Sequence, residues 1–340
     1  MSRVRVAVIG AGSWGRNHVR TLAGMADAEL TAVCDVDERR LAQVQKQFPS
    51  VRVTARLSEA LDGAEAVVVA TPAATHAAVA TEAIDRGLPA LVEKPLAMSA
   101  AEARGLAQRA ERAGVPVVTG HLLLFHPALE RLREMIEAGE LGPIYYLYSQ
   151  RVNLGQVRPD ENALWSFGPH DVSVARFLLG ERPAAVSARG HSYLQPGIED
   201  VVFLTLEFGS GAMAHVQMSW LDPHKERRLT VVGAKRMVVF DDMQPREKLK
   251  VFDKGVDRPP EYRSYGESLA VREGDIFIPR IPNVEPLTAE LRHFLAVARG
   301  AERPRVTAWD GVEVVEILEV ASASLKGDGR AMALGAPART

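Results

Sequence analysis

The chain has 340 residues, which is more than one hydrophobic core usually organises, so we expect about two domains. Hydrophobic residues make up 47%, charged residues 25%, and the formal net charge is -2, a composition typical of soluble globular proteins. Without a basic excess, a nucleic-acid-binding function is excluded. The single cysteine, Cys34, cannot form an internal disulfide, which indicates a reducing compartment. We find no signal segment and no apolar run near the roughly 18 residues of a membrane helix, so we expect a cytoplasmic protein.

The first predicted strand, over residues 4–9, runs directly into a glycine-rich turn. A strand followed by G-x-G-x-x-G at the start of a helix is the dinucleotide-binding pattern. The first glycine permits the tight turn, the second lets the backbone approach a pyrophosphate, and the third lets the helix pack on the strand. We therefore predict a Rossmann domain whose pyrophosphate-binding residues are Gly10, Gly12, Ser13, Trp14 and Gly15.

The second predicted strand, over 30–34, ends at Asp35, which lies 20 residues beyond Gly15. A carboxylate at this place accepts hydrogen bonds from the adenosine ribose and repels a 2′-phosphate. The cofactor is therefore predicted to be NAD rather than NADP. Arg39 and Arg40 could in principle hold a phosphate, but we assign them to the polar face of the next helix.

Strand and helix signals continue to alternate through the first third of the chain. We expect helices at 37–47, 73–86 and 99–113, a capped helical turn from Ser58, and strands at 51–54, 66–70, 88–92 and 115–118. This alternation predicts a doubly wound parallel sheet. We place the domain boundary near Gly120, which gives a Rossmann domain over 1–120 and a substrate-binding and oligomerisation α+β domain over 121–340.

Beyond residue 120 the pattern changes to one helix followed mostly by strands. We expect helices at 127–138, within 169–179, at 287–298 and at 310–325, and strands at 144–152, 201–208, 212–221, 228–232 and 237–240. Segment 244–283 contains five prolines and predicts a long irregular connection. The strands predict a large, mainly antiparallel sheet with one open face. We expect another subunit to cover that face in a homodimer or homotetramer.

In an open α/β sheet the ligand lies at the carboxyl ends of the strands. Two further strand ends carry suitable side chains here, Thr71-Pro72 with His76 one turn later, and Glu93-Lys94-Pro95. Together with the glycine turn and its following Arg16-Asn17-His18, these strings resemble the glucose-fructose oxidoreductase, inositol dehydrogenase and rhizopine-catabolism (Gfo/Idh/MocA) family. The resemblance covers essentially the whole chain, including His170.

The resemblance implies hydride transfer between NAD and a hydroxyl-bearing carbon of a sugar or cyclitol. The residues that would then lie at the cofactor are Thr71, Pro72, His76, Glu93 and Lys94. Lys94 and His170 would act on the reacting hydroxyl. The chemistry agrees, because alcohol oxidation needs a base within hydrogen-bond reach of the oxygen. Lysine can donate to the same oxygen and stabilise the developing alkoxide.

Two simpler interpretations stay open at this point. Lys94 would then be a surface lysine at a strand end, and His170 a locally capped histidine at the start of a helix. Many family members carry an aspartate four residues before this histidine, whereas this chain has Ser166 there. Whether Asp171 replaces that aspartate is left open.

Polar residues before His170 are candidates for substrate binding: Arg151, Asn153, Arg158, Asn162 and Trp165. Arginine suits carboxylate or phosphate, and asparagine suits sugar hydroxyls, although the arginines could equally form a solvated rim. The strings around His121 and Trp165 resemble members that oxidise position 3 of a nucleotide-activated amino sugar. That is the predicted substrate.

Three alternatives remain: a dehydrogenase of a free sugar or cyclitol, a catalytically silent NAD-binding sensor, and a glycoside-cleaving enzyme that uses NAD transiently. No metal site is predicted, because His121 and His126 have no carboxylate partner in the same string. The roles of His18, His121 and His126 are left open.

Overall fold

The computed structural model describes residues 3–155, 157–159, 161–257 and 270–336. Contacts divide the chain into two compact units. The first contains the residues up to Phe125 together with Val284–Glu316, and the second contains His126–Asn283 with Ile317–Ala336. The sequence predicted a single boundary near Gly120. In the structure, residues 284–316 return to the first unit.

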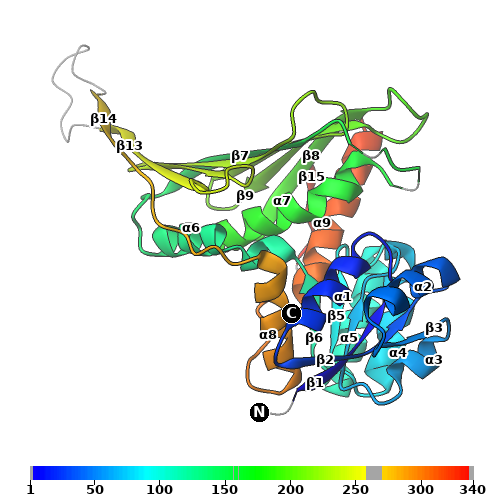
Figure 1. Ribbon diagram of the computed structural model, residues 1–340. Helices are drawn as coiled ribbons and strands as arrows, with labels where there is room; N and C mark the ends of the chain where they lie inside the picture. Colours follow the sequence, from blue (N-terminus) through cyan, green and yellow to red (C-terminus); the bar gives the residue numbers. More distant parts are fainter. Residues whose placement is uncertain (1–2, 156, 160, 258–269, 337–340) are drawn as a thin grey trace. The chain divides into compact units, whose positions relative to one another are not determined.

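The first unit contains a six-stranded sheet in the order β3-β2-β1-β4-β5-β6 (Figure 1). Every neighbouring pair is parallel, which confirms the doubly wound prediction. This order is that of the dinucleotide-binding fold. The strands are β1 (Val4–Ile9), β2 (Ala28–Cys34), β3 (Arg52–Thr54), β4 (Ala66–Val69), β5 (Ala90–Glu93) and β6 (Val117–Gly120).

Local sequence signals explain where several helices of this unit begin and end. The Asp37 side chain accepts from the Arg39 N–H at the start of α2, and Ser99 accepts from the Glu102 N–H at the start of α5. Gly114 ends α5 in the left-handed conformation, at φ 65°. The helices are α1 (Gly15–Gly24), α2 (Glu38–Gln47), α3 (Leu57–Leu61), α4 (His76–Asp85) and α5 (Ala100–Ala113), with 3-10 turns η1 (Ala73–Thr75) and η2 (Leu122–Phe125).

Helix α8 (Pro286–Ala298) contacts α1 and η2, although it is far away in the sequence. Its buried residues Leu287, Leu291 and Phe294 join the core cluster that also contains Val8 and Leu22. An apolar helical face of this kind predicts a partner but does not say which one. The return of the chain to the first unit was therefore beyond sequence analysis.

The second unit contains a nine-stranded sheet in the order β14-β13-β12-β11-β7-β10-β9-β8-β15. The β7–β10 pair is parallel and the remaining pairs are antiparallel, so the mainly antiparallel prediction is confirmed. The strands are β7 (Ile144–Val152), β8 (Pro183–His191), β9 (Val201–Phe208), β10 (Met213–Ser219), β11 (Glu226–Gly233), β12 (Met237–Asp241), β13 (Leu249–Asp257), β14 (Ala270–Phe277) and β15 (Met332–Ala333).

The prediction of an irregular connection over 244–283 was wrong. Strands β13 and β14 pair with each other, and β13 extends the sheet from β12 (Figure 1). Proline interrupts a strand ladder only where it lies within it. Pro245, Pro279 and Pro282 lie outside both strands, and Pro259 and Pro260 fall outside the described residues.

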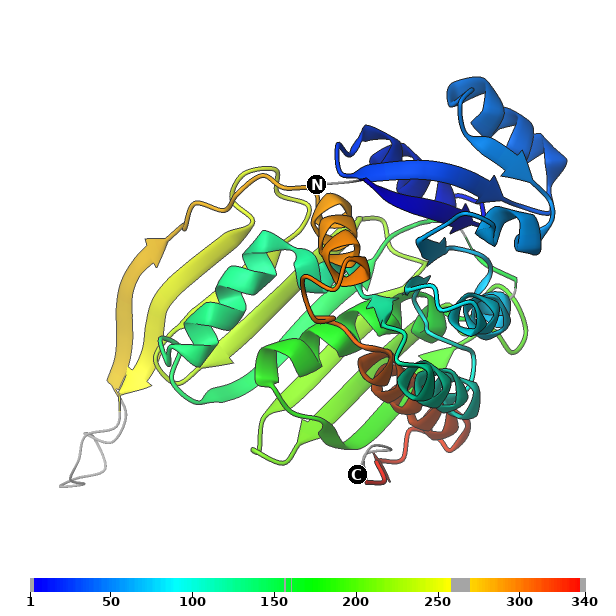
Figure 2. The same ribbon diagram turned by 90° about the horizontal axis from the view of Figure 1, so that it is seen from below.

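Helices α6 (Pro127–Glu137) and α7 (Ala163–Leu179) lie along one face of this sheet (Figures 1 and 2). The later part of α9 (Ala308–Lys326) packs on α7, where Trp165 Nε1 donates to Ser322 Oγ at 3.0 Å. The opposite face exposes large side chains, namely Tyr146, Tyr148, Phe203 and Met213. Among the described residues, every helix is too short or too polar to span a membrane.

Candidate active site

The glycine turn at the carboxyl end of β1 is built by close backbone packing. Gly10 has φ +98°, and a Cβ there would lie 2.5 Å from the Ala70 carbonyl oxygen. A Cβ on Gly15 would lie 2.0 Å from the Gly10 oxygen. By contrast, the nearest atom to a Cβ on Gly12 is the Arg40 guanidinium, at 3.7 Å. Packing therefore requires glycine at two positions, while Gly12 leaves room for a ligand to approach the backbone.

The Asp35 carboxylate lies at the end of β2, next to this turn. Its Oδ2 accepts from the Ala11 N–H at 2.7 Å, and its Oδ1 accepts from the Asp37 N–H at 2.8 Å. Arg40 Nη1 lies 3.5 Å from the same Oδ2. The side chain is thus held as a carboxylate acceptor beside the predicted pyrophosphate site. The sequence assigned Arg40 only to the polar face of α2. In the structure its guanidinium also lies beside the Asp35 carboxylate.

A buried polar network connects the glycine turn to β5. The Glu93 carboxylate accepts from Trp14 Nε1 and lies 2.7 Å from His18 Nε2. His18 is fully buried in α1. Burial acts to raise the pKa of Glu93, but the hydrogen bond and charge of His18, the charge of Lys94 and the Trp14 bond lower it below its ordinary value. Glu93 therefore holds Trp14 and His18 in place as an ionised acceptor.

The ends of β4 and β5 are connected through His76. One ring nitrogen lies 2.8 Å from the Thr71 carbonyl oxygen, and the other lies 2.8 Å from the Pro95 carbonyl oxygen. The Lys94-Pro95 peptide is cis, and the Lys94 N–H donates to Glu93 Oε2 at 3.2 Å. His76 is buried, whereas Thr71 and Pro72 reach the surface. The geometry gives His76 the role of positioning both loops, with Lys94 on one of them.

Glu290, which was not among the predicted site residues, is fully buried in α8. No hydrogen-bond partner reaches either carboxylate oxygen within the described residues. Burial first, and then the charge of Glu93, raise the pKa of Glu290 well above its ordinary value. A signal was available, because Glu290 interrupts the apolar helical stripe of Leu287, Leu291 and Phe294.

In the second unit, His170 lies within α7 rather than at the start of a helix. The helix begins at Ala163, earlier than predicted, and continues through Pro169. Proline in a helix interior usually breaks the helix, but here the helix runs through Pro169. Ser166, which occupies the position of the family's aspartate, is buried in the same helix. His170 is therefore held on a regular helix that packs against β7, β9 and β10.

Asp171 accepts two hydrogen bonds from Arg151 of β7. Arg151 Nε lies 2.6 Å from Oδ2, and Nη2 lies 3.4 Å from Oδ1. Both side chains are largely buried, at 12% and 8% exposure. Arg151 is thus held against Asp171, the residue that follows His170, on the face of the sheet that the helices cover.

The remaining candidates for substrate binding have structural contacts. Asn162 caps α7 through the Trp165 N–H and donates to Glu199 at 2.6 Å. Trp165 bonds to α9, as described above. Arg158 pairs with Glu161 at 2.9 Å and is 48% exposed. Asn153 follows β7, and its main-chain N–H donates to Ser219 O at 3.1 Å.

The open histidine questions receive partial answers. His126 caps α6 through the Ala128 N–H, and its Nε2 lies 3.6 Å from Asp242 Oδ1. Burial lowers the pKa of His126. His121 is buried in the first unit. The described part of the chain contains no cluster of three or more histidine, cysteine or acidic side chains suited to a metal ion.

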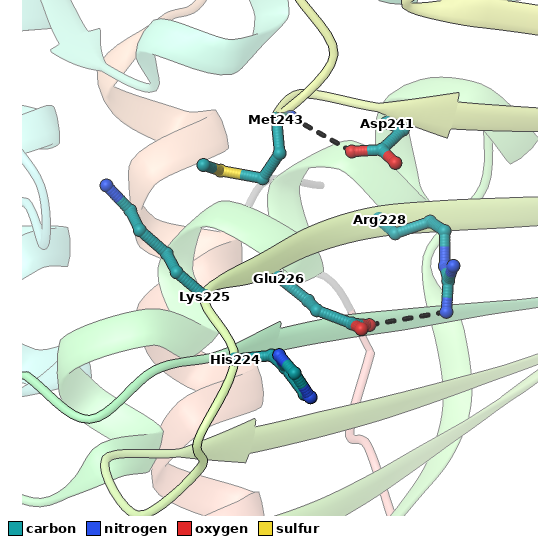
Figure 3. Close-up of a pocket in the computed structure, with 6 residues that line it drawn as sticks. All are labelled: His224, Lys225, Glu226, Arg228, Asp241 and Met243. Carbon is teal, nitrogen blue, oxygen red and sulfur yellow. Dashed lines mark hydrogen bonds and ion pairs between the residues drawn. The ribbon is translucent and has the colours of Figure 1, made fainter.

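A pocket of about 260 Å³ lies at the beginning of β11 and the end of β12 (Figure 3). Arg228 points toward Glu226, and the Asp241 carboxylate accepts from the Met243 N–H at 2.9 Å, while Lys225 points away from these groups (Figure 3). The remaining lining residue is His224. Because Arg228 pairs with Glu226 and Asp241 binds a main-chain N–H, we assign this pocket no catalytic role.

Comparisons with known proteins agree with this geometry. Residues 4–121 match the oxidoreductase family with an NAD-binding Rossmann fold, and residues 129–239 match the GFO/IDH/MocA C-terminal domain. The chain belongs to the Gfo/Idh/MocA family. Its first unit is the family's NAD-binding domain.

Individual relatives support this assignment. The chain is 32% identical over 224 residues to inositol 2-dehydrogenase 2 of Saccharopolyspora erythraea, covering 63% of this chain and 66% of that protein. It is 28% identical over 334 residues to the scyllo-inositol 2-dehydrogenase (NAD(+)) of Bacillus subtilis, covering 93% and 92%. The crystal structure of GenD2 from gentamicin A biosynthesis, in complex with NAD, is 28% identical, with TM-score 0.82 and coverage of 99% and 97%.

The residues of the first unit fit NAD. Gly12 is open toward a ligand, and Asp35 is held where the adenosine ribose hydroxyls would bind. Burial, followed by the charge of Asp35, raises the pKa of Cys34 to about 11, so this thiol stays protonated beside the site.

Proposed function

We propose that the protein is an NAD-dependent dehydrogenase that oxidises a secondary hydroxyl of a sugar or cyclitol. The observation that carries this proposal is the position of Glu93. It directly precedes Lys94, and its carboxylate accepts a hydrogen bond from Trp14 of the glycine turn. Through Glu93, side-chain contacts connect the predicted cofactor loop to the strand end that carries Lys94. Family membership supports the same reaction class.

In this mechanism each residue has a defined task. NAD, when bound, supplies the hydride acceptor. His170 takes the proton of the substrate hydroxyl as the carbon–hydrogen bond breaks. The Lys94 ammonium donates a hydrogen bond to the same oxygen and stabilises its negative charge. Because Arg151 binds the Asp171 carboxylate, we assign Asp171 to positioning Arg151 rather than to replacing the aspartate missing at Ser166.

More narrowly, we propose that the substrate is a nucleotide-activated amino sugar, which the protein oxidises at position 3. Arg151 brings a largely buried guanidinium to this part of the second unit, where it is bound to Asp171, and the strings around His121 and Trp165 resemble members with this activity. Arg158 contributes less to this argument, because its guanidinium is solvated and paired with Glu161.

The test is incubation of the protein and NAD with a panel of nucleotide sugars, free sugars and inositols, followed by the absorbance of NADH. Rapid NADH formation with one class identifies it. NAD binding without turnover on any member would favour the sensor. Glycoside cleavage without net NADH would favour transient oxidation and re-reduction.

We also propose a cytoplasmic homodimer or homotetramer that forms through the open face of the nine-stranded sheet. The exposed side chains Tyr146, Tyr148, Phe203 and Met213 support it, because isolated monomers rarely expose such a continuous apolar surface. Light scattering measures the oligomeric state directly, and a monomer at micromolar concentration would contradict this proposal.

A further inference from the structure

Two arginines face each other on the helix-covered side of the second-unit sheet. Arg227 of β11 and Arg151 of β7 are directly opposed in the antiparallel register. Arg151 binds Asp171 of α7, which places this pair on the same face as that helix. Neighbouring Arg228 pairs with Gln150 and lies on the other face. Like charges that are directly opposed across two strands destabilise a sheet.

Arg151 has a carboxylate partner in close contact, whereas the carboxylate nearest to Arg227 is farther away. Asp171 binds Arg151 through both oxygens, with a shortest contact of 2.6 Å. The carboxylate nearest to Arg227 is Asp242, at 4.0 Å. Asp242 also binds Lys248, at 3.2 Å. These side chains comprise three cations and two carboxylates, so a positive charge remains in excess beside Arg227.

The pKa of Arg227 agrees with an excess of positive charge around it. The Arg227 side chain is 44% exposed. Its partial burial and then the charge of Arg151 lower the pKa of Arg227, and Asp242 and Asp171 offset this effect only in part. An arginine still remains charged at neutral pH. A bound anion would therefore reduce the electrostatic repulsion between the Arg227 and Arg151 side chains.

We propose that Arg227 and Arg151 together form an anion-binding subsite for the substrate, beside Asp171, the residue that follows His170. Guanidinium groups present paired donors that match the two oxygens of a carboxylate or phosphate. This subsite rests on the proposed dehydrogenase function and narrows its substrate to sugars that carry such a group. The anion is either a carboxylate on the sugar ring or a phosphate of an activated sugar.

Anion binding is measured on the full chain, without turnover, as the shift in melting temperature caused by inorganic phosphate, D-glucuronate or D-glucose. Ligands that bind the native state raise its stability. We expect phosphate, glucuronate or both to stabilise the protein more than glucose does, and Arg227→Gln to abolish this difference. Arg228→Gln is the matched control, because it removes a guanidinium from the same strand on the opposite face.

The outcomes separate the two possible anions and test the subsite. A response to phosphate alone identifies an activated sugar, and a response to glucuronate alone identifies a ring carboxylate. An equal anion response in the unmodified protein and in Arg227→Gln, or none in the unmodified protein, overturns the proposal. Without ligand, we expect Arg227→Gln to melt no lower than the unmodified protein, because it removes a like-charge contact. If Arg227→Gln fails to fold, Arg227→Lys keeps the charge and should retain a weaker anion response.

Kinetics provide the second measurement. With an anionic substrate, Arg227→Gln should raise KM about tenfold, or about 1.4 kcal/mol, and change kcat little. With a neutral sugar, KM should stay the same. If no sugar is oxidised at all, the dehydrogenase proposal fails, while the loss of anion-induced stabilisation in Arg227→Gln still supports the subsite.

Discussion

The two units hold their candidate catalytic residues in different ways. In the first, Lys94 directly follows a parallel strand, and its neighbour Glu93 is bound to the glycine turn by short contacts. In the second, His170 lies in the middle of helix α7, which packs against β7, β9 and β10. The strand end is thus held by side-chain contacts with the neighbouring turn and helix, whereas the position of a residue on a helix face depends on the strands that pack against that helix.

The strongest test of the first arrangement is Glu93→Ala. It leaves buried His18 and the Trp14 indole N–H without their acceptor. Breaking a buried pair in this way costs about 3–5 kcal/mol, so we expect a lower urea midpoint and weaker NAD binding. Glu93→Gln keeps one acceptor oxygen and should lose less. An unchanged midpoint in Glu93→Ala would mean that the network does not stabilise this unit.

Substitution of both catalytic candidates tests whether the two units act on one hydroxyl. Lys94→Met and His170→Asn should each lower kcat by about 10²-fold or more, the scale of losing a positioned acid or base. NAD affinity, measured by calorimetry, should stay normal. The double variant should lose much less than the product of the two effects, because groups that act as a unit are not additive. Full multiplication of the effects would indicate independent roles.

Two buried carboxyl groups of the first unit can be compared, Glu290 and Glu93. Glu93 contacts His18, whereas no hydrogen-bond donor within the described residues reaches Glu290. The pKa of Glu290 is raised by burial, so the folded state keeps a proton that the unfolded state releases. Stability should therefore fall as pH rises from the unfolded pKa toward the folded one, by at most about 1.4 kcal/mol per pH unit. Unfolding free energies measured from pH 5 to 9 check this slope.

Glu290→Gln should remove that part of the slope, because an amide resembles the protonated carboxyl but does not titrate. Glu134→Gln is the control, since Glu134 is 64% exposed. Glu93 acts in the opposite direction, because its lowered pKa gives stability that is lost as pH falls. Identical pH profiles for the unmodified protein and Glu290→Gln would contradict the assignment of Glu290 as a buried neutral acid.

The smallest expected effect concerns cofactor choice. Asp35→Ser removes the carboxylate that would repel a 2′-phosphate and leaves Arg40 beside the site. We expect the preference for NAD over NADP to shrink about tenfold, or about 1.4 kcal/mol. Asp35→Ser with Arg40→Ala should recover part of the preference, because the guanidinium that can bind the phosphate is then absent. Equal affinities for both nucleotides in the unmodified protein would refute the role of Asp35.

Several parts of the fold were predictable because their signals are local. The glycine turn, the parallel alternation and the Ser99 cap depend on residues that are close in the sequence. The β13–β14 hairpin was missed, because prolines outside the strands were counted against them. The helix start at Ala163 was also missed. That helix contains Pro169 and packs against the sheet.

The sequence by itself determined the Rossmann domain, its NAD-binding glycine turn and the family resemblance. Only the tertiary structure decided that Asn162 is a helix cap, that Glu290 is buried near Glu93, and that Arg227 opposes Arg151. The physical reason is separation along the chain. Turn and capping preferences act between near neighbours, whereas burial and cross-strand register arise only when distant segments pack together.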